Sequence, residues 1–279
     1  MAKKKTIRTI PQERTPMREQ DAGARAKNFG EVACGYSVEE ALREAERCLL
    51  CPDEPCIKGC PVSIDIPGFI RKIGEKDFRG AYDVIAETNL LAAVCGRVCP
   101  QETQCEKVCT VGESLEPVAI GRLERFVGDA AIQNAWGRVP SVAPNGFCIG
   151  IVGSGPAGMA CAADMAKAGC EVTVFEAFHQ PVGVLKYGIP DFRLPNEVVD
   201  AEIENLRKLG VTFECNTLVG RLFTIEQMID EVGFHAVFIG TGVSNSGKSR
   251  ARSRLQRVSS SLAESTPLRE SPGTPSIDG

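Results

Sequence analysis

Residues 147–176 read FCIGIVGSGPAGMACAADMAKAGCEVTVFE, and this stretch decides the fold of the C-terminal half. An apolar run from Phe147 to Val152 ends in glycines, an alanine-rich segment follows, and a second apolar run ends at Glu176. This order predicts a βαβ unit. The pattern continues with a helix at about 196–209, a strand at 211–214, a helix at 224–231 and a strand at 235–240. An α/β domain is therefore expected over 147–243.

The turn inside this unit matches the dinucleotide fingerprint GxGxxG, as Gly153, Ser154, Gly155, Pro156, Ala157 and Gly158. Gly153 permits the tight turn, Gly155 lets the backbone approach a pyrophosphate, and Gly158 allows close helix packing. The phosphate would sit at the helix N-terminus, and Glu176 would accept the ribose hydroxyls. The pattern does not separate FAD from NAD, but an acidic strand end disfavours the 2′-phosphate of NADPH here.

The N-terminal half is predicted to be mainly helical. Residues 1–35 form an extended arm without periodicity, and a capping box of Ser37 and Glu40 opens an amphipathic helix over 38–50. Further helices are expected from Asp65 and Pro67, from Asp77 to about 88, and from Pro117 to about 136. A Pro- and Gly-punctuated linker at 137–146 then separates 36–136 from the α/β domain.

Eight of the 13 cysteines form two closely spaced groups. One group is Cys48, Cys51, Cys56 and Cys60, and the other is Cys95, Cys99, Cys105 and Cys109. Short spacings with Cys-Pro endings indicate two [4Fe-4S] clusters, and two tetrahedral zinc sites are the alternative. Core packing is the better interpretation for most of the others, which are Cys34, Cys148, Cys161, Cys170 and Cys215. His235 is interpreted as structural.

Composition excludes several classes for this chain of 279 residues with 43% hydrophobic side chains. Its longest apolar run, Leu90 to Cys95, is too short for a membrane span. The basic start has no apolar signal region, so a reducing cytoplasm is expected, where disulfides are rare. Residues 36–243 carry 18 basic and 29 acidic side chains, which argues against nucleic-acid binding.

Five motifs together resemble one family: the cysteine groups, GRLERF at 121–126, VGSGPAGMACA at 152–162, YGIPDFRLP at 187–195 and FIGTG at 238–242. The chain resembles the small (beta) chain of NADPH-dependent glutamate synthase over about 36–242. Relatives of that chain include ferredoxin:NADP transhydrogenase flavoprotein subunits and the N-terminal part of dihydropyrimidine dehydrogenase. The resemblance implies a helical domain with two [4Fe-4S] clusters, followed by an FAD domain interrupted by an NADPH domain.

By this resemblance, Cys48, Cys51, Cys56 and Cys109 hold one cluster. Cys60, Cys99 and Cys105 hold the other, with Glu124 as the candidate fourth ligand and Cys95 as its competitor. In the flavin half, Gly153–Gly158 and Glu176 form the FAD adenylate site, and Thr241 and Gly242 close on the flavin. Gly183 corresponds to the second glycine of a Gly-Gly pair near the flavin, whose first position is Val182 here.

The resemblance implies an electron path from NADPH through FAD and the two clusters to a large (alpha) subunit, where glutamate forms from glutamine and 2-oxoglutarate. No catalytic side chain is required on this chain. Another FMN- or ferredoxin-type acceptor, as in a transhydrogenase or pyrimidine reductase, is the first alternative. A short iron-sulfur protein that docks without catalysis is the second.

The sequence after 243 departs from the family. Residues 244–279 contain ten Ser, five Arg and no second glycine fingerprint, so no NADPH domain is expected there. We expect a disordered tail, and an out-of-frame reading of the gene end is the hypothesis for its origin. The overall expectation is an α-helical di-cluster domain followed by an incomplete Rossmann-type FAD domain.

Overall fold

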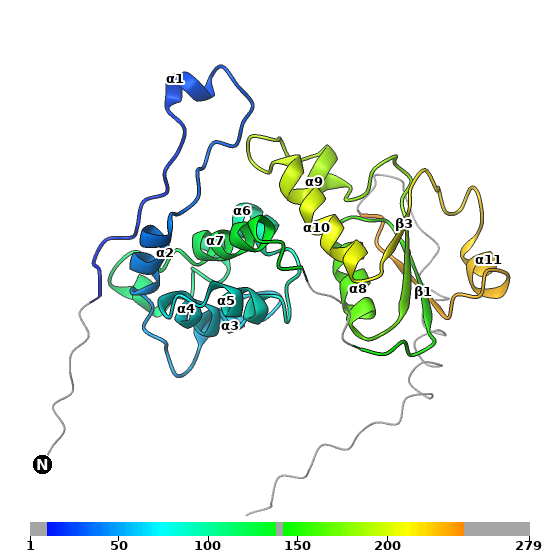
Figure 1. Ribbon diagram of the computed structural model, residues 1–279, viewed down its shortest axis with the longest axis horizontal. Coiled ribbons are helices and arrows are strands. Elements are labelled where there is room, and N and C mark those ends of the chain that lie inside the picture. Colours follow the sequence, from blue (N-terminus) through cyan, green and yellow to red (C-terminus); the bar gives the residue numbers. More distant parts are fainter. Residues whose placement is uncertain (1–9, 138–141, 243–279) are drawn as a thin grey trace, which may run out of the picture. The chain divides into compact units, whose positions relative to one another are not determined.

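The computed structural model describes residues 10–137 and 142–242, and Figure 1 traces their course. The predicted tail at 244–279 and part of the predicted linker lie outside the described residues. Within the described part, helices dominate the N-terminal half, and a four-stranded parallel sheet follows. The expected order of a helical domain and a Rossmann-like segment is confirmed.

The N-terminal half packs six α-helices around one core. They are α2 (Val38–Ala45), α3 (Pro55–Gly59), α4 (Ile66–Gly74), α5 (Phe78–Ile85), α6 (Ala92–Val98) and α7 (Ile120–Gln133), with 3₁₀ turns η1 (Gln101–Thr103) and η2 (Thr110–Glu113). Phe69, Ile85 and Leu123 are fully buried in this core. The predicted capping box of Ser37 and Glu40 is present. These local signals therefore place the helix starts.

Two of the expected helices have different ends. The helix predicted over 38–50 stops at Ala45, because Arg47 is buried and donates to the carbonyls of Glu116 and Pro117. The chain then turns through Leu50, whose φ is 52°. The helix expected from Pro117 begins at Ile120. Helices α3 and α6 were not predicted; they contain Cys56 and Cys95, and Cys60 and Cys99 follow their last residues.

The sheet follows the predicted βαβ pattern closely. Its strands are β1 (Cys148–Val152), β2 (Glu171–Phe175), β3 (Thr212–Glu214) and β4 (Ala236–Ile239), all parallel in the order β3-β2-β1-β4. The connecting helices are α8 (Pro156–Lys167), α9 (Val184–Tyr187), α10 (Asn196–Lys208) and α11 (Ile225–Asp230). Because β1 and β2 are adjacent and parallel, the fingerprint turn and Glu176 meet at their carboxyl ends.

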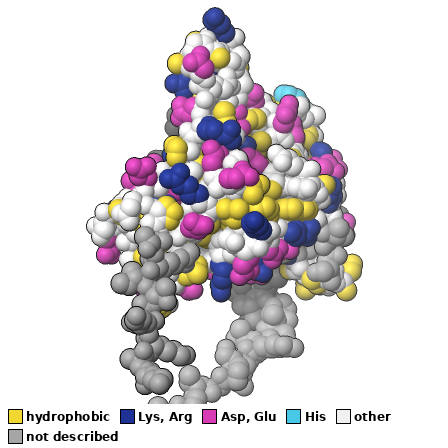
Figure 2. Space-filling view, turned by 60° about the vertical axis from the view of Figure 1, so that its left-hand side comes forward, with side chains coloured by type: hydrophobic (Ala, Val, Ile, Leu, Met, Phe, Trp, Pro, Cys, Tyr) yellow, Lys and Arg dark blue, Asp and Glu magenta, His cyan; other side chains and the backbone are white. Residues whose placement is uncertain are grey.

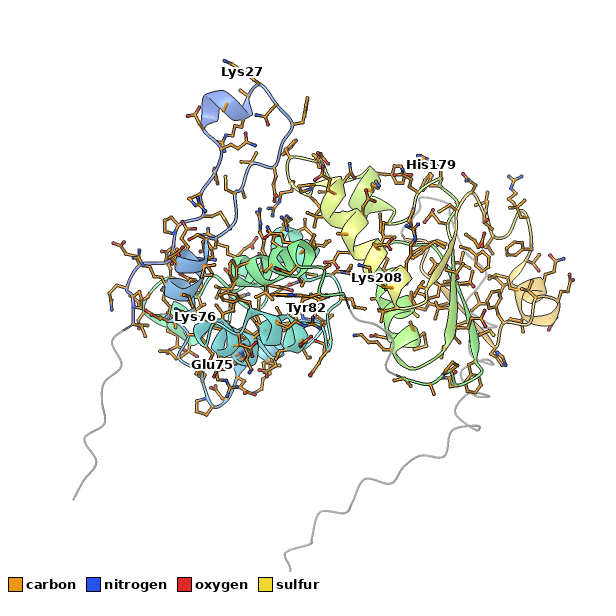
Figure 3. All side chains as sticks on the ribbon, viewed as in Figure 1. Lys27, Glu75, Lys76, Tyr82, His179 and Lys208 are labelled. Atoms are coloured by element: carbon orange, nitrogen blue, oxygen red, sulfur yellow. The ribbon has the colours of Figure 1, made fainter. Side chains whose placement is uncertain are left out.

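The arm expected over 1–35 is largely extended where it is described, and it also carries the short helix α1 (Ala22–Arg25). Glu19 and Ala33 form an antiparallel bridge, so the chain folds back on itself as a hairpin. Figure 3 shows Lys27 near the far end of this hairpin. Glu31 fixes the hairpin to the helices, because it pairs with the buried guanidinium groups of Arg97 at 2.8 Å and Arg125 at 3.0 Å.

Candidate cofactor sites

The first predicted ligand set lines one cavity. Cys48, Cys51, Cys56 and Cys109 line a pocket whose other walls are mostly apolar. Burial and the neighbouring thiols of Cys48 and Cys109 raise the pKa of Cys56 to about 12. Thr110 is the hydroxyl side chain at this cavity, and its Oγ1 lies 3.4 Å from Cys51 Sγ. The structure thus brings together the four cysteines assigned to one cluster.

Members of the second set also lie near one another. Burial first, and then the charges of Glu106, Glu124 and Cys60, raise the pKa of Cys105. Burial and the neighbouring Cys99 raise the pKa of Glu124 to about 8. Glu124 is therefore a buried carboxyl side chain beside Cys99 and Cys105, as the expected fourth ligand would be.

Cys95, the competitor of Glu124, borders the second set. A hydrogen bond with Cys99, together with burial, raises the pKa of the Cys95 thiol. Asn89 joins both candidates, since its Nδ2 donates to Glu124 Oε1 at 2.8 Å and its Oδ1 lies 3.7 Å from Cys95 Sγ. The arrangement leaves both candidates within reach of this site.

No three His, Cys, Asp or Glu side chains of the described residues come close enough together to hold a single metal ion. The four thiols of the first set instead stand around a cavity. In a [4Fe-4S] cluster each thiolate binds a different iron, so ligands spread around a central volume fit such a group.

The three fingerprint glycines have the environments expected from their roles. Gly153 has φ 97°, and a Cβ there would lie 2.7 Å from the carbonyl oxygen of Gly240. A Cβ on Gly158 would lie only 1.9 Å from the Gly153 oxygen, so helix α8 packs directly on the turn. A Cβ on Gly155 would meet no heavy atom within 4 Å. The backbone at Gly155 thus faces open space at the start of α8, where a phosphate would bind.

Three other predicted nucleotide residues, Glu176, Gly183 and Thr241, also lie beside this turn. Glu176 is buried, and its Oε1 accepts from the Phe178 amide at 3.0 Å. Val182 has φ 88°, which is unusual for a β-branched residue. A Cβ on Gly183 would lie 3.6 Å from Gly155 Cα, and a Cβ on Gly153 would lie 3.0 Å from Thr241 Cα. Gly242 follows Thr241 with φ 78°.

The side chains outside the two sets have structural surroundings. His235 Nδ1 accepts from the Cys148 amide at 3.0 Å, which fits its predicted structural role. Cys148, Cys161, Cys170 and Cys215 are partly buried, whereas Cys34 is exposed and does not pack in the core. His179, labelled in Figure 3, lies beyond β2. Its Nδ1 is 3.4 Å from the Tyr187 hydroxyl.

The surface carries charges of both signs, as the composition suggests. Figure 2 shows Lys and Arg side chains interspersed with Asp and Glu on one face of the molecule. None of the described helices combines the length and the hydrophobicity that crossing a bilayer requires.

Comparison with known families defines the class of this chain. Residues 25–136 match the family described as dihydropyrimidine dehydrogenase domain II, 4Fe-4S cluster. Residues 151–210 match the NAD(P)-binding Rossmann-like domain family. The chain therefore joins a domain of the 4Fe-4S class to a Rossmann-like nucleotide-binding segment.

Its homologues are oxidoreductase subunits, and the expected resemblance is confirmed. The NAD-dependent dihydropyrimidine dehydrogenase subunit PreT of Escherichia coli K12 is 42% identical over 215 residues, covering 77% of this chain and 52% of the relative. The glutamate synthase [NADPH] small chain of the same organism is 35% identical over 219 residues, covering 78% and 46%. The chain thus spans about half the length of these curated relatives.

Sequence reasoning missed several polar residues at these sites. Asn89, Thr110 and Ser154 stand beside predicted ligands, yet each is a common residue type without its own spacing pattern. For Ser154 there was one indication in the sequence: it lies between Gly153 and Gly155 inside the fingerprint, so its place in the turn was expected. Their contacts depend on segments far apart in sequence, so only the fold reveals them.

Proposed function

We propose that this chain is an electron-transferring iron-sulfur flavoprotein subunit with two [4Fe-4S] clusters and an FAD site. When bound, FAD would take up hydride from NADPH and the clusters would pass single electrons to a partner subunit. The observation that carries the proposal is the meeting of Cys48, Cys51, Cys56 and Cys109 around one cavity. A match to the 4Fe-4S family over residues 25–136 supports it.

The chain's own residues would hold and separate these groups. Cys48, Cys51, Cys56 and Cys109 would ligate one cluster, and Cys60, Cys99, Cys105 and Glu124 the other. Apolar side chains such as Ile70 and Val118 line the first pocket, and apolar surroundings would disfavour added negative charge on a reduced cluster. Both sites would bind their groups through ligand bonds alone, and neither would need a catalytic acid or base.

The nucleotide half would bind the adenylate of FAD. Gly155 and the N-terminus of α8 would face the diphosphate, with Pro156 and Ala157 opening the helix, while Glu176 would face the ribose. Gly183 and Thr241 lie beside the same turn, and together with Gly242 they would border the flavin. NADPH would bind elsewhere, because the acidic strand end disfavours its 2′-phosphate.

The acceptor has two candidates. Glutamate formation with a large glutamate synthase-type subunit is the first, supported by the 35% identity to that small chain. A pyrimidine-reducing partner subunit is the second candidate, supported by the 42% identity to PreT. Each partner would accept electrons from the cluster domain, and cytoplasmic location is expected for both.

Anaerobic purification with metal, sulfide and flavin analysis tests the proposal. We expect about eight irons per chain, since two [4Fe-4S] clusters hold four each, with bound flavin and a broad visible absorption. Iron without flavin would favour the docking protein that does not catalyse. Zinc alone would overturn the iron-sulfur assignment.

A further inference from the structure

The hydroxyl of Ser154 connects three segments of the nucleotide half. Ser154 is fully buried, and its Oγ donates to Glu176 Oε2 through a short hydrogen bond. The same Oγ accepts from the Val182 amide at 2.7 Å. The fingerprint turn, the end of β2 and the segment before α9 therefore meet at one oxygen atom.

The hydrogen bonds to the Glu176 carboxylate leave it little room to accept further donors. The Ser154 amide donates to Oε2 at 3.1 Å, and the Phe178 amide donates to Oε1 at 3.0 Å. A carboxylate offers about four lone-pair positions. With the Ser154 hydroxyl, three are taken, and the remaining one belongs to Oε1. Glu176 can therefore accept one additional donor, such as one ribose hydroxyl.

The bond to Val182 has a second effect. Val182 is fully buried at φ 88°, a conformation that costs a β-branched residue free energy and persists only when its surroundings hold it. The Ser154 Oγ supplies the partner for its amide. Because the next residue, Gly183, lies against Gly155, this bond also holds the 182–183 backbone over the phosphate turn.

We propose that Ser154 is a positioning residue for nucleotide recognition, which presents a single Glu176 oxygen to the ribose and couples ribose binding to the Val182–Gly183 segment. The inference rests on the proposed nucleotide site and adds a residue to it. Ser154 itself touches Glu176 and Val182 and acts through them. Its loss should therefore weaken discrimination between riboses as well as affinity.

Binding of ADP and 2′-deoxy-ADP to the full chain, measured by calorimetry, tests this. The unaltered protein should prefer ADP. Ser154→Ala should lower ADP affinity about tenfold, the scale of one lost hydrogen bond to a charged group, and should bring the two ligands closer together in affinity. Glu176→Gln should do the same, and the double variant should add little. Thr224→Ala is the matched control. The Thr224 hydroxyl caps α11 by accepting from the Gln227 amide and takes no part in the contacts of Ser154 with Glu176 and Val182.

An equal loss for both ligands in Ser154→Ala would show a merely structural role and overturn the inference. Tighter ADP binding would overturn it too, because the hydroxyl would then compete with the ribose. If the unaltered chain bound neither ligand, the nucleotide site of the proposed function would fall and the inference with it.

Hydrogen exchange in the unaltered protein tests the same coupling without a variant. ADP should slow amide exchange in residues 180–188 more than 2′-deoxy-ADP does, at equal site occupancy. Equal protection by the two ligands would contradict the coupling of the ribose to Val182.

Discussion

At the scale of single residues, the second cluster site poses a choice between two side chains. Glu124 is buried beside Cys99 and Cys105, whereas Cys95 shares a hydrogen bond with Cys99. We expect Glu124→Ala to lower the iron content from about eight toward about four per chain, since one cluster loses a ligand. Cys95→Ala should retain its iron. Iron analysis and electron paramagnetic resonance of the anaerobic protein provide the measurement.

Glu102→Ala is the matched control for this pair, because Glu102 is exposed between Cys99 and Cys105. Loss of iron from Cys95→Ala, with normal iron in Glu124→Ala, would reverse the ligand assignment. Side-chain chemistry alone does not decide between them, since both residues have a suitable donor atom; only the resemblance to the family favours Glu124.

Thr110 lies at the other cluster site. Its Oγ1 is 3.4 Å from Cys51 Sγ, and a thiolate ligand can only accept, so the hydroxyl would donate to the sulfur. Hydrogen bonds to cluster sulfurs stabilise the reduced state. Thr110→Val should therefore make the reduction potential more negative, on the order of 59 mV for a tenfold change in a one-electron equilibrium.

A spectroscopic redox titration measures this shift. Thr103→Val is the control, because that exposed hydroxyl donates to the Pro100 carbonyl and not to a cysteine. Thr110→Ser should restore most of the potential. A potential that is the same in Thr110→Val and the unaltered protein would refute the role of the hydroxyl.

At the scale of elements, α6 and α7 cross with backbone contact. A Cβ on Gly96 would lie 2.4 Å from the Arg125 amide nitrogen, so the two helices would have to separate. Gly96→Ala should lower the free energy of unfolding by about 1–3 kcal/mol, as overpacking does. A Cβ on Gly74, at the end of α4, would meet no heavy atom within 4 Å. Gly74→Ala should therefore raise the free energy of unfolding by about 0.4–1 kcal/mol. Urea unfolding distinguishes the two, and similar stabilities for both variants would contradict the close crossing.

The same elements show what the sequence can predict. Helix α2 and the sheet strands were expected, because a capping box and apolar strand runs are local signals. Helix α6 was missed because its N-cap, Leu91, makes no side-chain cap and its seven residues show no clear polar face. Its helical form depends on packing against α7. The cysteine sets were recognisable from spacing. Asn89 meets Glu124 at the second set, and Ser154 meets Val182 at the nucleotide turn, only through contacts between distant segments.

At the scale of the whole molecule, Glu202 of α10 links the α/β part to the helical part. Its Oε1 accepts from the Ala93 amide of α6 at 3.3 Å, beside a core in which Leu90 and Val94 pack with the sheet residues. Glu202 is buried, with 4% of its surface exposed. The link between the two parts therefore includes an ionisable group whose charge is costly to bury.

Burial raises the pKa of Glu202 from 4.5 to about 7, against smaller opposing effects of Asn205 and the Ala93 amide. The folded chain therefore keeps this proton at pH values where the unfolded chain has lost it. Stability from this group is fully present below about pH 4.5 and falls as the pH rises toward about 7. Glu202→Gln should remove that fall, a difference of up to about 3 kcal/mol between pH 5 and pH 8. Urea unfolding at both pH values measures this difference in stability. Glu204→Gln is the control, because Glu204 is an exposed glutamate of the same helix. Equal pH dependence in Glu202→Gln and the unaltered chain would mean that the buried carboxyl does not control how the two parts hold together.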